Sequence, residues 1–196
     1  SKIPTRATPA PIKPANGEAL KKARQWLLEA QNPLMIVGLD AVHQNASSPR
    51  IDFCKKFGVP VVTTYKAKGI VPEDDEWSLG AAGLSPLGDK NISPVVHASD
   101  LILLVGYDPI EMRTGWRNLW DSSKTRVVEF LIAPEYSYMH KSSLRFICNI
   151  SEGIEALSKG LEKKTTWKNG ELIERRNKHE KIYGQKQEWG PGAITE

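Results

Sequence analysis

Two short runs of apolar residues, each ending at a glycine, constrain the fold of this chain most strongly. Leu34–Val37 precedes Gly38, and Leu101–Val105 precedes Gly106, and neither run contains a polar residue. A strand that is apolar on both faces has to be covered on both faces. Such runs are typical of central strands in a parallel sheet that lies between two layers of helices. The pattern therefore predicts an α/β protein.

Further strands and helices alternate with these two runs. The same patterns predict strands at 59–64, 126–132 and 145–150, and helices at 17–31, 51–57, 92–98 and from Ser151 to Leu161. Asn16 is expected to cap the first helix, Ser48, Pro49 and Gly58 to bracket the second, and Ser151 to cap the last. Alternating strands and helices imply right-handed βαβ units. We therefore expect a three-layer, Rossmann-like open parallel sheet with helices on both faces.

Both ends of the chain differ in composition from its middle. The 196 residues suit one domain with tails. Residues 1–16 contain four prolines and are expected to be an inter-domain linker. Residues 163–196 are strongly polar, with a predicted helix around 171–182, and are expected to be a second linker. This leaves 17–162 as the folded domain, and we expect both tails to contribute little to its stability.

Charge and cysteine content exclude several classes of protein. The net charge is +4, but the basic excess lies in the tails, because residues 23–156 hold thirteen Lys/Arg against sixteen Asp/Glu. This distribution argues against nucleic-acid binding. No apolar stretch is long enough to span a bilayer and no secretory signal is visible. Cys54 and Cys148 lie within apolar patterns and are expected to be buried thiols. We expect a cytoplasmic protein without membrane contact.

The loops after the predicted strands hold the candidate binding residues, because open α/β sheets bind ligands at the carboxyl ends of their strands. The candidates for a nucleotide crevice are Gly38, Lys66, Lys68, Gly69, Gly106, Tyr107 and Asp108. Gly38 lacks the further glycines of a phosphate fingerprint and is favoured as a strand-end turn. The two lysines beside Gly69 suit either an anion site or a solvated loop. Asp108 and Glu111 are favoured for capping and salt bridges.

No motif predicts catalysis or a metal site. The histidines His43, His97, His140 and His179 are widely separated, without the spacing of metal ligands. A nucleophile elbow, a P-loop and a kinase signature are all missing from the sequence. We therefore assign no catalytic residue and no metal ligand.

The order of segments resembles one family. Residues 17–160 resemble the central domain of thiamine-diphosphate-dependent enzymes of the acetolactate synthase and decarboxylase group. The resemblance rests on Asn32–Pro33, on 57–83 (FGVPVVTTYKAKGIVPEDDEWSLGAAG), on 98–111 (ASDLILLVGYDPIE) and on the strands near 126 and 145. It implies a six-stranded parallel sheet that is not catalytic by itself, in a homo-oligomeric dimer or tetramer. Flanking domains would hold thiamine diphosphate and magnesium, the latter at a Gly-Asp-Gly motif that Leu87-Gly88-Asp89-Lys90 does not match.

The resemblance also bears on flavin binding. Flavin-containing members of the family hold FAD with glycines after the first strand, where this chain has Leu39 and Asp40. The segment from Tyr107 to Glu111 resembles the flavin-free members. A structural role is therefore favoured over the alternative, a nucleotide-binding module that holds FAD or ADP. A carboxylate at Asp40 would repel a diphosphate, so ADP ranks above FAD and no ligand ranks above both.

Overall fold

The computed structural model describes residues 10–44, 47–134, 139–168 and 170–183, which form an open α/β fold around one sheet. The sheet has six strands in the order β3-β2-β1-β4-β5-β6, and every pair is parallel. The strands are β1 (Pro33–Val37), β2 (Val61–Thr64), β3 (Ser78–Ala82), β4 (Leu101–Val105), β5 (Arg126–Leu131) and β6 (Leu144–Ile147). The predicted fold class is confirmed.

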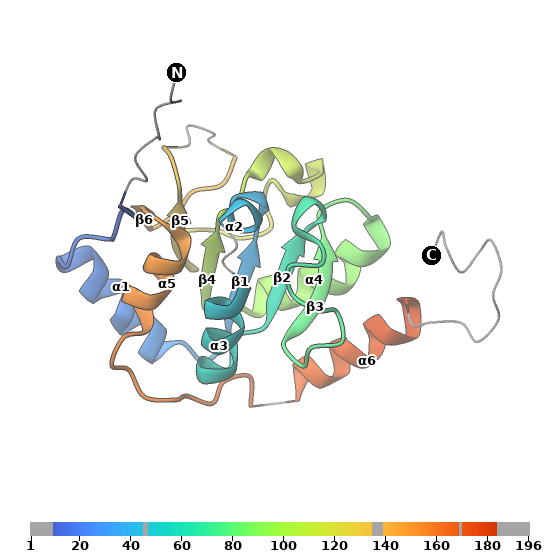
Figure 1. The fold of residues 1–196 in the computed structure, drawn as a ribbon. Coiled ribbons are helices and arrows are strands. Elements are labelled where there is room, and N and C mark those ends of the chain that lie inside the picture. Colours follow the sequence, from blue (N-terminus) through green and yellow to red (C-terminus); the bar gives the residue numbers. More distant parts are fainter. Residues whose placement is uncertain (1–9, 45–46, 135–138, 169, 184–196) are drawn as a thin grey trace, which may run out of the picture.

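Helices cover both faces of the sheet, as the continuous apolar strands require. The α-helices are α1 (Glu18–Glu29), α2 (Leu39–His43), α3 (Ser47–Phe57), α4 (Pro86–Ala98), α5 (Ile150–Ser158) and α6 (Glu171–Tyr183). In Figure 1, α3 and α5 lie in front of the sheet and α4 lies behind it. No helix in the described ranges combines the length and the apolar content that a bilayer crossing requires.

Alternate residues of each central strand pack into two separate hydrophobic cores, one on each face of the sheet. Met35 and Val37 of β1 pack with α1, α3 and α5, whereas Leu34 and Ile36 pack with α4. The second core also receives Trp116 from the long connection between β4 and β5. That connection contains only short 3-10 turns, at Pro109–Glu111 and Thr114–Trp116. It takes the place of a helix on the α4 face.

Two elements were missing from the residue-pattern prediction. The residue pattern does not predict β3, because its sequence Ser-Leu-Gly-Ala-Ala is made mostly of small residues and lacks an apolar run. The strand is nevertheless largely buried, since α4 covers it. The sixth strand had been implied only by the family resemblance. The five-residue helix α2 was also missed, because so short a segment shows no helical periodicity.

The predicted helix starts needed four corrections. α3 begins at Ser47, so Ser48, predicted to precede the helix, lies inside its first turn. α1 has Gly17 rather than Asn16 as its N-cap residue, without a side-chain hydrogen bond. α5 begins at Ile150, and the side chain of Asn149, not Ser151, accepts the capping hydrogen bond from the Glu152 amide. α4 extends six residues further toward the N-terminus than predicted and begins after Ser85, whose hydroxyl accepts from the Gly88 amide. Asn and Ser are equivalent as capping residues, so the sequence alone did not locate the α5 cap.

Residues 163–168 seal the amino edge of the sheet, contrary to the expectation that this segment packs little. The Trp167 amide donates to the Gln31 carbonyl (3.0 Å), and its indole Nε1 donates to the Pro33 carbonyl (2.7 Å). The Lys164 ammonium donates to the carbonyls of Leu28 and Ala30 at the end of α1. Trp167 is buried in the α4-side core. The expectation was wrong here because one large aromatic residue can anchor an otherwise polar segment.

We expect Trp167→Ala to destabilise the domain by about 3–5 kcal/mol, because it empties a buried indole site. Trp167→Phe keeps most of the packing and loses the hydrogen bond to Pro33, so it should cost roughly 1–2 kcal/mol. Urea unfolding of the chain and both variants measures this difference. Equal midpoints for all three proteins would show that the segment does not pack on the sheet in solution.

Candidate functional site

The carboxyl ends of β1 and β4 form the point at which ligands are expected to bind in a sheet of this strand order. From β1 the sheet runs through β2 to β3 on one side, and through β4, β5 and β6 on the other. The crevice of such sheets opens where the order reverses, between β1 and β4. Gly38, Gly106, Tyr107 and Asp108 follow these two strands. The structure therefore brings four of the seven candidate residues together.

The backbones of Gly38 and Gly106 close this crevice. The Gly38 amide donates to the Val105 carbonyl (3.0 Å) and the Asp40 amide to the Gly106 carbonyl (3.2 Å). A Cβ on Gly38 would lie 2.3 Å from the Gly106 carbonyl oxygen, and a Cβ on Gly106, which has φ +59°, would lie 2.5 Å from the Ala41 nitrogen. Both glycines are thus required by packing. The backbones after β1 and β4 are therefore in direct contact at this point.

Two carboxylates add a negative potential to the same point. Burial raises the pKa of Asp40 above its usual value, and the nearby charge of Asp108 adds to this, while His43 opposes it. His43 Nδ1 lies 3.9 Å from Asp40 Oδ1. The Asp108 carboxylate accepts a hydrogen bond from the Ile110 amide (3.0 Å), as its predicted capping role requires. An anionic ligand here would face two like charges, both on partly exposed side chains.

Among the described residues, no contact places the side chain of Lys66 or Lys68 in this crevice. The Lys68 ammonium pairs with Glu73 at 3.3 Å, within its own loop. The Lys66 ammonium lies 5.9 Å from the centre of the Tyr65 ring. Gly69 has φ +88°, and nothing lies within 4 Å of a Cβ placed on it, so glycine is explained by the turn itself. These contacts favour the solvated loop over the anion site.

At two helices whose N-termini reach this edge, α4 and α5, the chain itself supplies acceptors for the first amides. At α5, the Ile150 amide donates to Gln44 Oε1 (2.7 Å) and the Glu152 amide to Asn149 Oδ1 (3.2 Å). At α4, the Ser85 hydroxyl accepts from the Gly88 amide, and the Asp89 carboxylate accepts from the Gly83 amide at 2.6 Å. Helix N-termini bind phosphate through amides that are free. These amides are already occupied.

A buried cluster that sequence reasoning missed lies beside the candidate residues. His140 Nε2 is 2.6 Å from the Trp116 carbonyl oxygen and Nδ1 is 2.9 Å from the Tyr107 hydroxyl. A carbonyl only accepts, so Nε2 carries the proton and Nδ1 accepts from Tyr107. Burial raises the pKa of the Tyr107 hydroxyl well above its usual value, which keeps it a donor. The Trp120 ring lies 4.3 Å from the imidazole. Tyr107 thus anchors the β4–β5 connection instead of facing a ligand.

Glu111 departs from the salt-bridge role predicted for it. Its side chain is buried, and neither carboxylate oxygen has a hydrogen-bond partner in the part of the chain that the structure describes. A buried carboxylate nearby that does form an ion pair is Glu129, which binds the partly exposed Arg145 across β5 and β6 at 2.7 Å. Asp108 and Glu111 look alike in the sequence. The burial of Glu111 depends on how the 3-10 turn at Pro109–Glu111 is placed in the fold, which no sequence pattern shows.

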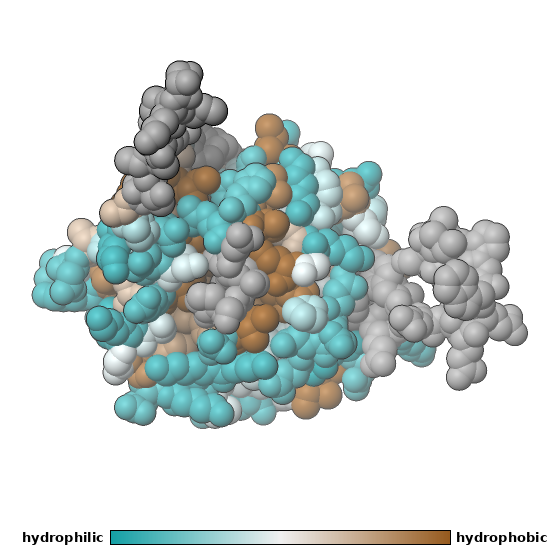
Figure 2. Space-filling model, viewed as in Figure 1, coloured by the Kyte–Doolittle hydropathy of each residue, from teal (hydrophilic) through white to brown (hydrophobic). Residues whose placement is uncertain are grey.

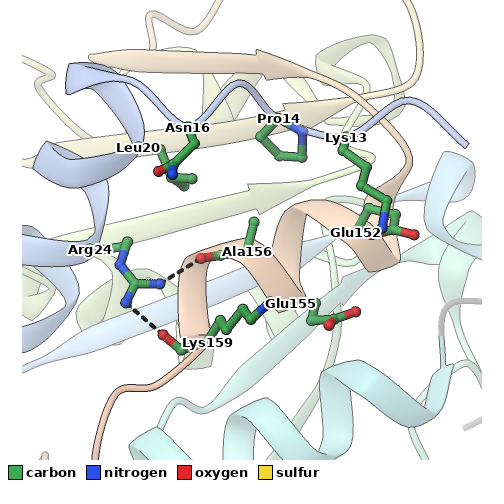
Figure 3. A pocket seen from close by; sticks show the side chains of 9 residues that line it. All are labelled: Lys13, Pro14, Asn16, Leu20, Arg24, Glu152, Glu155, Ala156 and Lys159. Carbon is green, nitrogen blue, oxygen red and sulfur yellow. Dashed lines mark hydrogen bonds and ion pairs between the residues drawn. The ribbon is translucent and has the colours of Figure 1, made fainter.

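A surface cavity of about 480 Å³ lies away from the strand ends, between the N-terminal arm, α1 and α5 (Figure 3). Arg24 projects across it and donates to the carbonyls of Ala156 (2.8 Å) and Lys159 (2.6 Å). Lys13 of the arm pairs with Glu152 at 3.1 Å. Arg24 therefore satisfies the C-terminal carbonyls of α5, and Lys13 holds the arm. The cavity is the groove along which the N-terminal arm attaches to α5. The contacts of Arg24 and Lys13 in it hold the structure together and do not form a catalytic arrangement.

The close approach at Gly38 can be tested by adding one methyl group. We expect Gly38→Ala to lower the free energy of unfolding by at least about 2 kcal/mol, because the new Cβ would meet backbone atoms that cannot move independently. Gly115→Ala is the matched control, since nothing lies within 4 Å of a Cβ at Gly115, and it should stay within about 0.5 kcal/mol of the parent. Chemical denaturation compares the three proteins. A Gly38→Ala protein as stable as the control would contradict the packing argument.

The His140 cluster predicts a dependence of stability on pH. Burial lowers the pKa of His140 below its usual 6.5, and the Trp116 carbonyl and Glu129 oppose this only in part. The folded state therefore binds this proton less readily than the unfolded state does, so the stabilisation is complete above pH 6.5 and is lost as the pH falls below it. Denaturation at a series of pH values from 8 to about 5 should show the loss. His140→Gln should flatten this part of the profile, and an unchanged slope would argue against the cluster.

Comparison with known proteins identifies the family. A family model described as thiamine pyrophosphate enzyme, central domain, matches residues 20–157. A protein assigned as a thiamin diphosphate-dependent enzyme from Mycobacterium smegmatis has a solved structure that aligns with 82% of this chain and 30% of its own, with a TM-score of 0.60 and 17% identity. That likeness supports the fold.

Curated relatives agree with the family model. Acetolactate synthase of Bacillus subtilis is 28% identical over 155 residues, which cover 76% of this chain and 26% of the relative. The 3D-(3,5/4)-trihydroxycyclohexane-1,2-dione hydrolase of Geobacillus thermodenitrificans is 21% identical over 144 residues, which cover 74% and 22%. The chain thus spans about a quarter of the length of these relatives. It belongs to the family of thiamine pyrophosphate enzyme central domains, related to acetolactate synthase.

Proposed function

We propose that this chain is the non-catalytic central domain of a thiamine-diphosphate-dependent enzyme of the acetolactate synthase type, acting on 2-oxo acids. The observation that carries the proposal is the family match over 20–157, in a chain whose backbones at Gly38 and Gly106 are in direct contact. The domain then serves as a rigid spacer. The flanking domains of the parent chain supply the chemistry.

The residues of this chain do not fit thiamine diphosphate or magnesium. Asp89, the nearest counterpart of a Gly-Asp-Gly aspartate, lies in the first turn of α4 and accepts from the Gly83 amide. In the described ranges, no group of three His, Cys, Asp or Glu side chains is placed to hold a metal ion. We therefore assign the cofactor and the magnesium of the parent enzyme to its flanking domains.

We also propose that the chain holds neither FAD nor ADP. The closed backbone at Gly38, the carboxylates of Asp40 and Asp108, and the pairing of Lys68 with Glu73 all oppose a diphosphate at the strand ends. FAD needs backbone amides at a helix N-terminus and room beside them. ADP makes the same demand with fewer atoms, so it ranks above FAD and below no ligand.

The parent enzyme is further proposed to be a cytoplasmic homo-oligomer that binds neither nucleic acid nor membranes. Cys54 and Cys148 are both buried. Burial raises the pKa of Cys148 to about 11, which keeps it protonated and unreactive. A buried thiol of this kind suits a reducing compartment.

Calorimetric titration of the purified chain with FAD and with ADP tests the ligand claim. We expect no binding tighter than about 1 mM for either, because affinity in this range needs preorganised phosphate contacts. Micromolar FAD binding, or a yellow protein on purification, would replace the spacer role with that of a flavin-binding module. Micromolar ADP binding alone would support a nucleotide module instead. Pyruvate turnover by this chain alone, with added thiamine diphosphate and magnesium, would contradict the non-catalytic role.

A further inference from the structure

A second surface cavity, of about 590 Å³, lies between the start of α4 and the connection from β4 to β5. Pro86, Asp89 and Ser93 line it from α4, and residues 113–116 line it from the connection. In Figure 1, the connection (yellow-green) lies at the top of the view and the start of α4 (green) to its right, and Figure 2 shows hydrophilic and hydrophobic residues together over this part of the surface. The volume falls in the range of small-molecule sites. The cavity therefore has room for a small organic ligand.

The cavity contains opposite charges that do not pair. Asp89 and Arg113 both line it, and in the described ranges neither side chain forms an ion pair. Asp89 Oδ1 accepts from the Gly83 amide at 2.6 Å, and the second carboxylate oxygen has no hydrogen bond among the described residues. The Arg113 side chain is exposed. Opposite charges that line one cavity without meeting are both available to a ligand.

Gly83 connects the two walls of the cavity. Its amide donates to the Asp89 carboxylate, and its carbonyl accepts from the Arg113 amide at 3.0 Å. Gly83 has φ +97°, and a Cβ placed on it would lie 2.3 Å from Met112 Sδ, so a larger residue would be strained there. The Asp89 carboxylate and the Arg113 backbone are thus held by one residue. The cavity between them is therefore part of the fold and not a chance gap between two surface loops.

Ser93 and Trp116 add polar groups to the walls. The Ser93 hydroxyl donates to the Asp89 carbonyl at 2.7 Å, which leaves the hydroxyl oxygen able to accept. Trp116 is 1% exposed, and its indole nitrogen is buried without a hydrogen-bond partner in the described ranges. Buried donors of native proteins are nearly always satisfied, so an acceptor is missing on this side. An oxygen of a ligand in the cavity would supply it.

A ligand that satisfies both charges needs an anionic and a cationic group of its own. A phosphate or a nucleotide would bring negative charge to Asp89, and a polyamine would bring positive charge to Arg113, so each would be repelled at one end. An α-amino acid carries a carboxylate and an ammonium group on one carbon atom. We propose that this cavity binds a free α-amino acid with an uncharged side chain, whose carboxylate pairs with Arg113 and whose ammonium group pairs with Asp89.

The apolar lining sets the class of amino acid. Pro86 and Trp116 provide apolar surface in the cavity, which suits an uncharged side chain on the ligand. Neither Asp89 nor Arg113 takes part in the contact between Gly38 and Gly106. The proposal therefore goes beyond the proposed function and needs no thiamine diphosphate. It adds a ligand-binding role to the spacer role.

Calorimetric titration of the purified chain with L-alanine, L-leucine and L-phenylalanine tests the proposal. We expect at least one of the three to bind with a Kd of about 1 mM or tighter. Its analogues without the ammonium group or without the carboxylate should bind at least about tenfold more weakly, because each leaves one charge unpaired. For L-leucine these analogues are 4-methylpentanoate and 3-methylbutylamine. Binding of all three amino acids that is weaker than about 1 mM would overturn the proposal.

Three variants locate the binding site. Arg113→Gln should weaken binding of the amino acid at least about tenfold, because it removes the guanidinium that pairs with the carboxylate. The exposed Arg113 side chain has no hydrogen bond among the described residues, so the variant should stay folded. Arg117→Gln is the matched control, since Arg117 is an exposed arginine of the same connection and is not among the residues that line the cavity. It should leave the Kd unchanged, and an equal loss in both arginine variants would contradict the proposal.

Asp89→Asn tests the ammonium contact separately. Asparagine keeps an oxygen that can accept from the Gly83 amide but loses the negative charge. The variant should therefore bind the amino acid and its carboxylate analogue with equal affinity, whereas a retained preference for the amino acid would place the ammonium group elsewhere and refute the assignment. Inorganic phosphate is titrated in parallel. Phosphate binding that Arg113→Gln abolishes, without binding of any amino acid, would show an anion site and overturn the proposal.

Discussion

The contact between the backbones of Gly38 and Gly106 determines what the carboxyl edge of this sheet can do. Because neither residue has a side chain, α2 starts directly against the end of β4, and the Asp40 amide donates to the Gly106 carbonyl. The same contact places Asp40 where the charge of Asp108 raises its pKa, in addition to the effect of burial. It also fixes where the β4–β5 connection leaves the sheet. Tyr107 and Trp116 can then pack over the α4 face, and Ile110 is left exposed.

The sequence was sufficient to predict those strands that are buried on both faces, because such strands are apolar at every position. β1 and β4 are buried at every position, and these were the clearest apolar runs. β3 is an edge strand of small residues whose burial comes from α4, so its identity depends on a tertiary contact that no local pattern records. Its register with β2 also shifts between Val61 and Thr63. Edge strands of this kind are defined by their neighbours more than by their own residues.

The sequence predicted where the candidate site lies in the fold but not how its residues contact one another. Strand ends located Gly38, Gly106 and Asp108 correctly, because parallel strands align their carboxyl ends. Local spacing did not reveal that the two glycines touch, or that His140 reaches Tyr107 from 33 residues away. The pairing of Lys68 with Glu73 lies within one loop, and the acidic tract in the sequence was a signal that could have suggested it. Trp167 likewise stood out as a large aromatic residue in a polar tail.

The two edges of the sheet differ in a way that bears on where the chemistry of the parent enzyme lies. The amino edge is completed by this chain's own residues, through Asp100, Lys164 and Trp167. The carboxyl edge exposes apolar side chains and leaves Glu111 buried without a hydrogen-bond partner in the described ranges. A small-molecule site needs convergent polar groups that are free to bind, whereas a protein interface needs exposed apolar area. The exposed apolar side chains of the carboxyl edge therefore have the character that contact with protein requires.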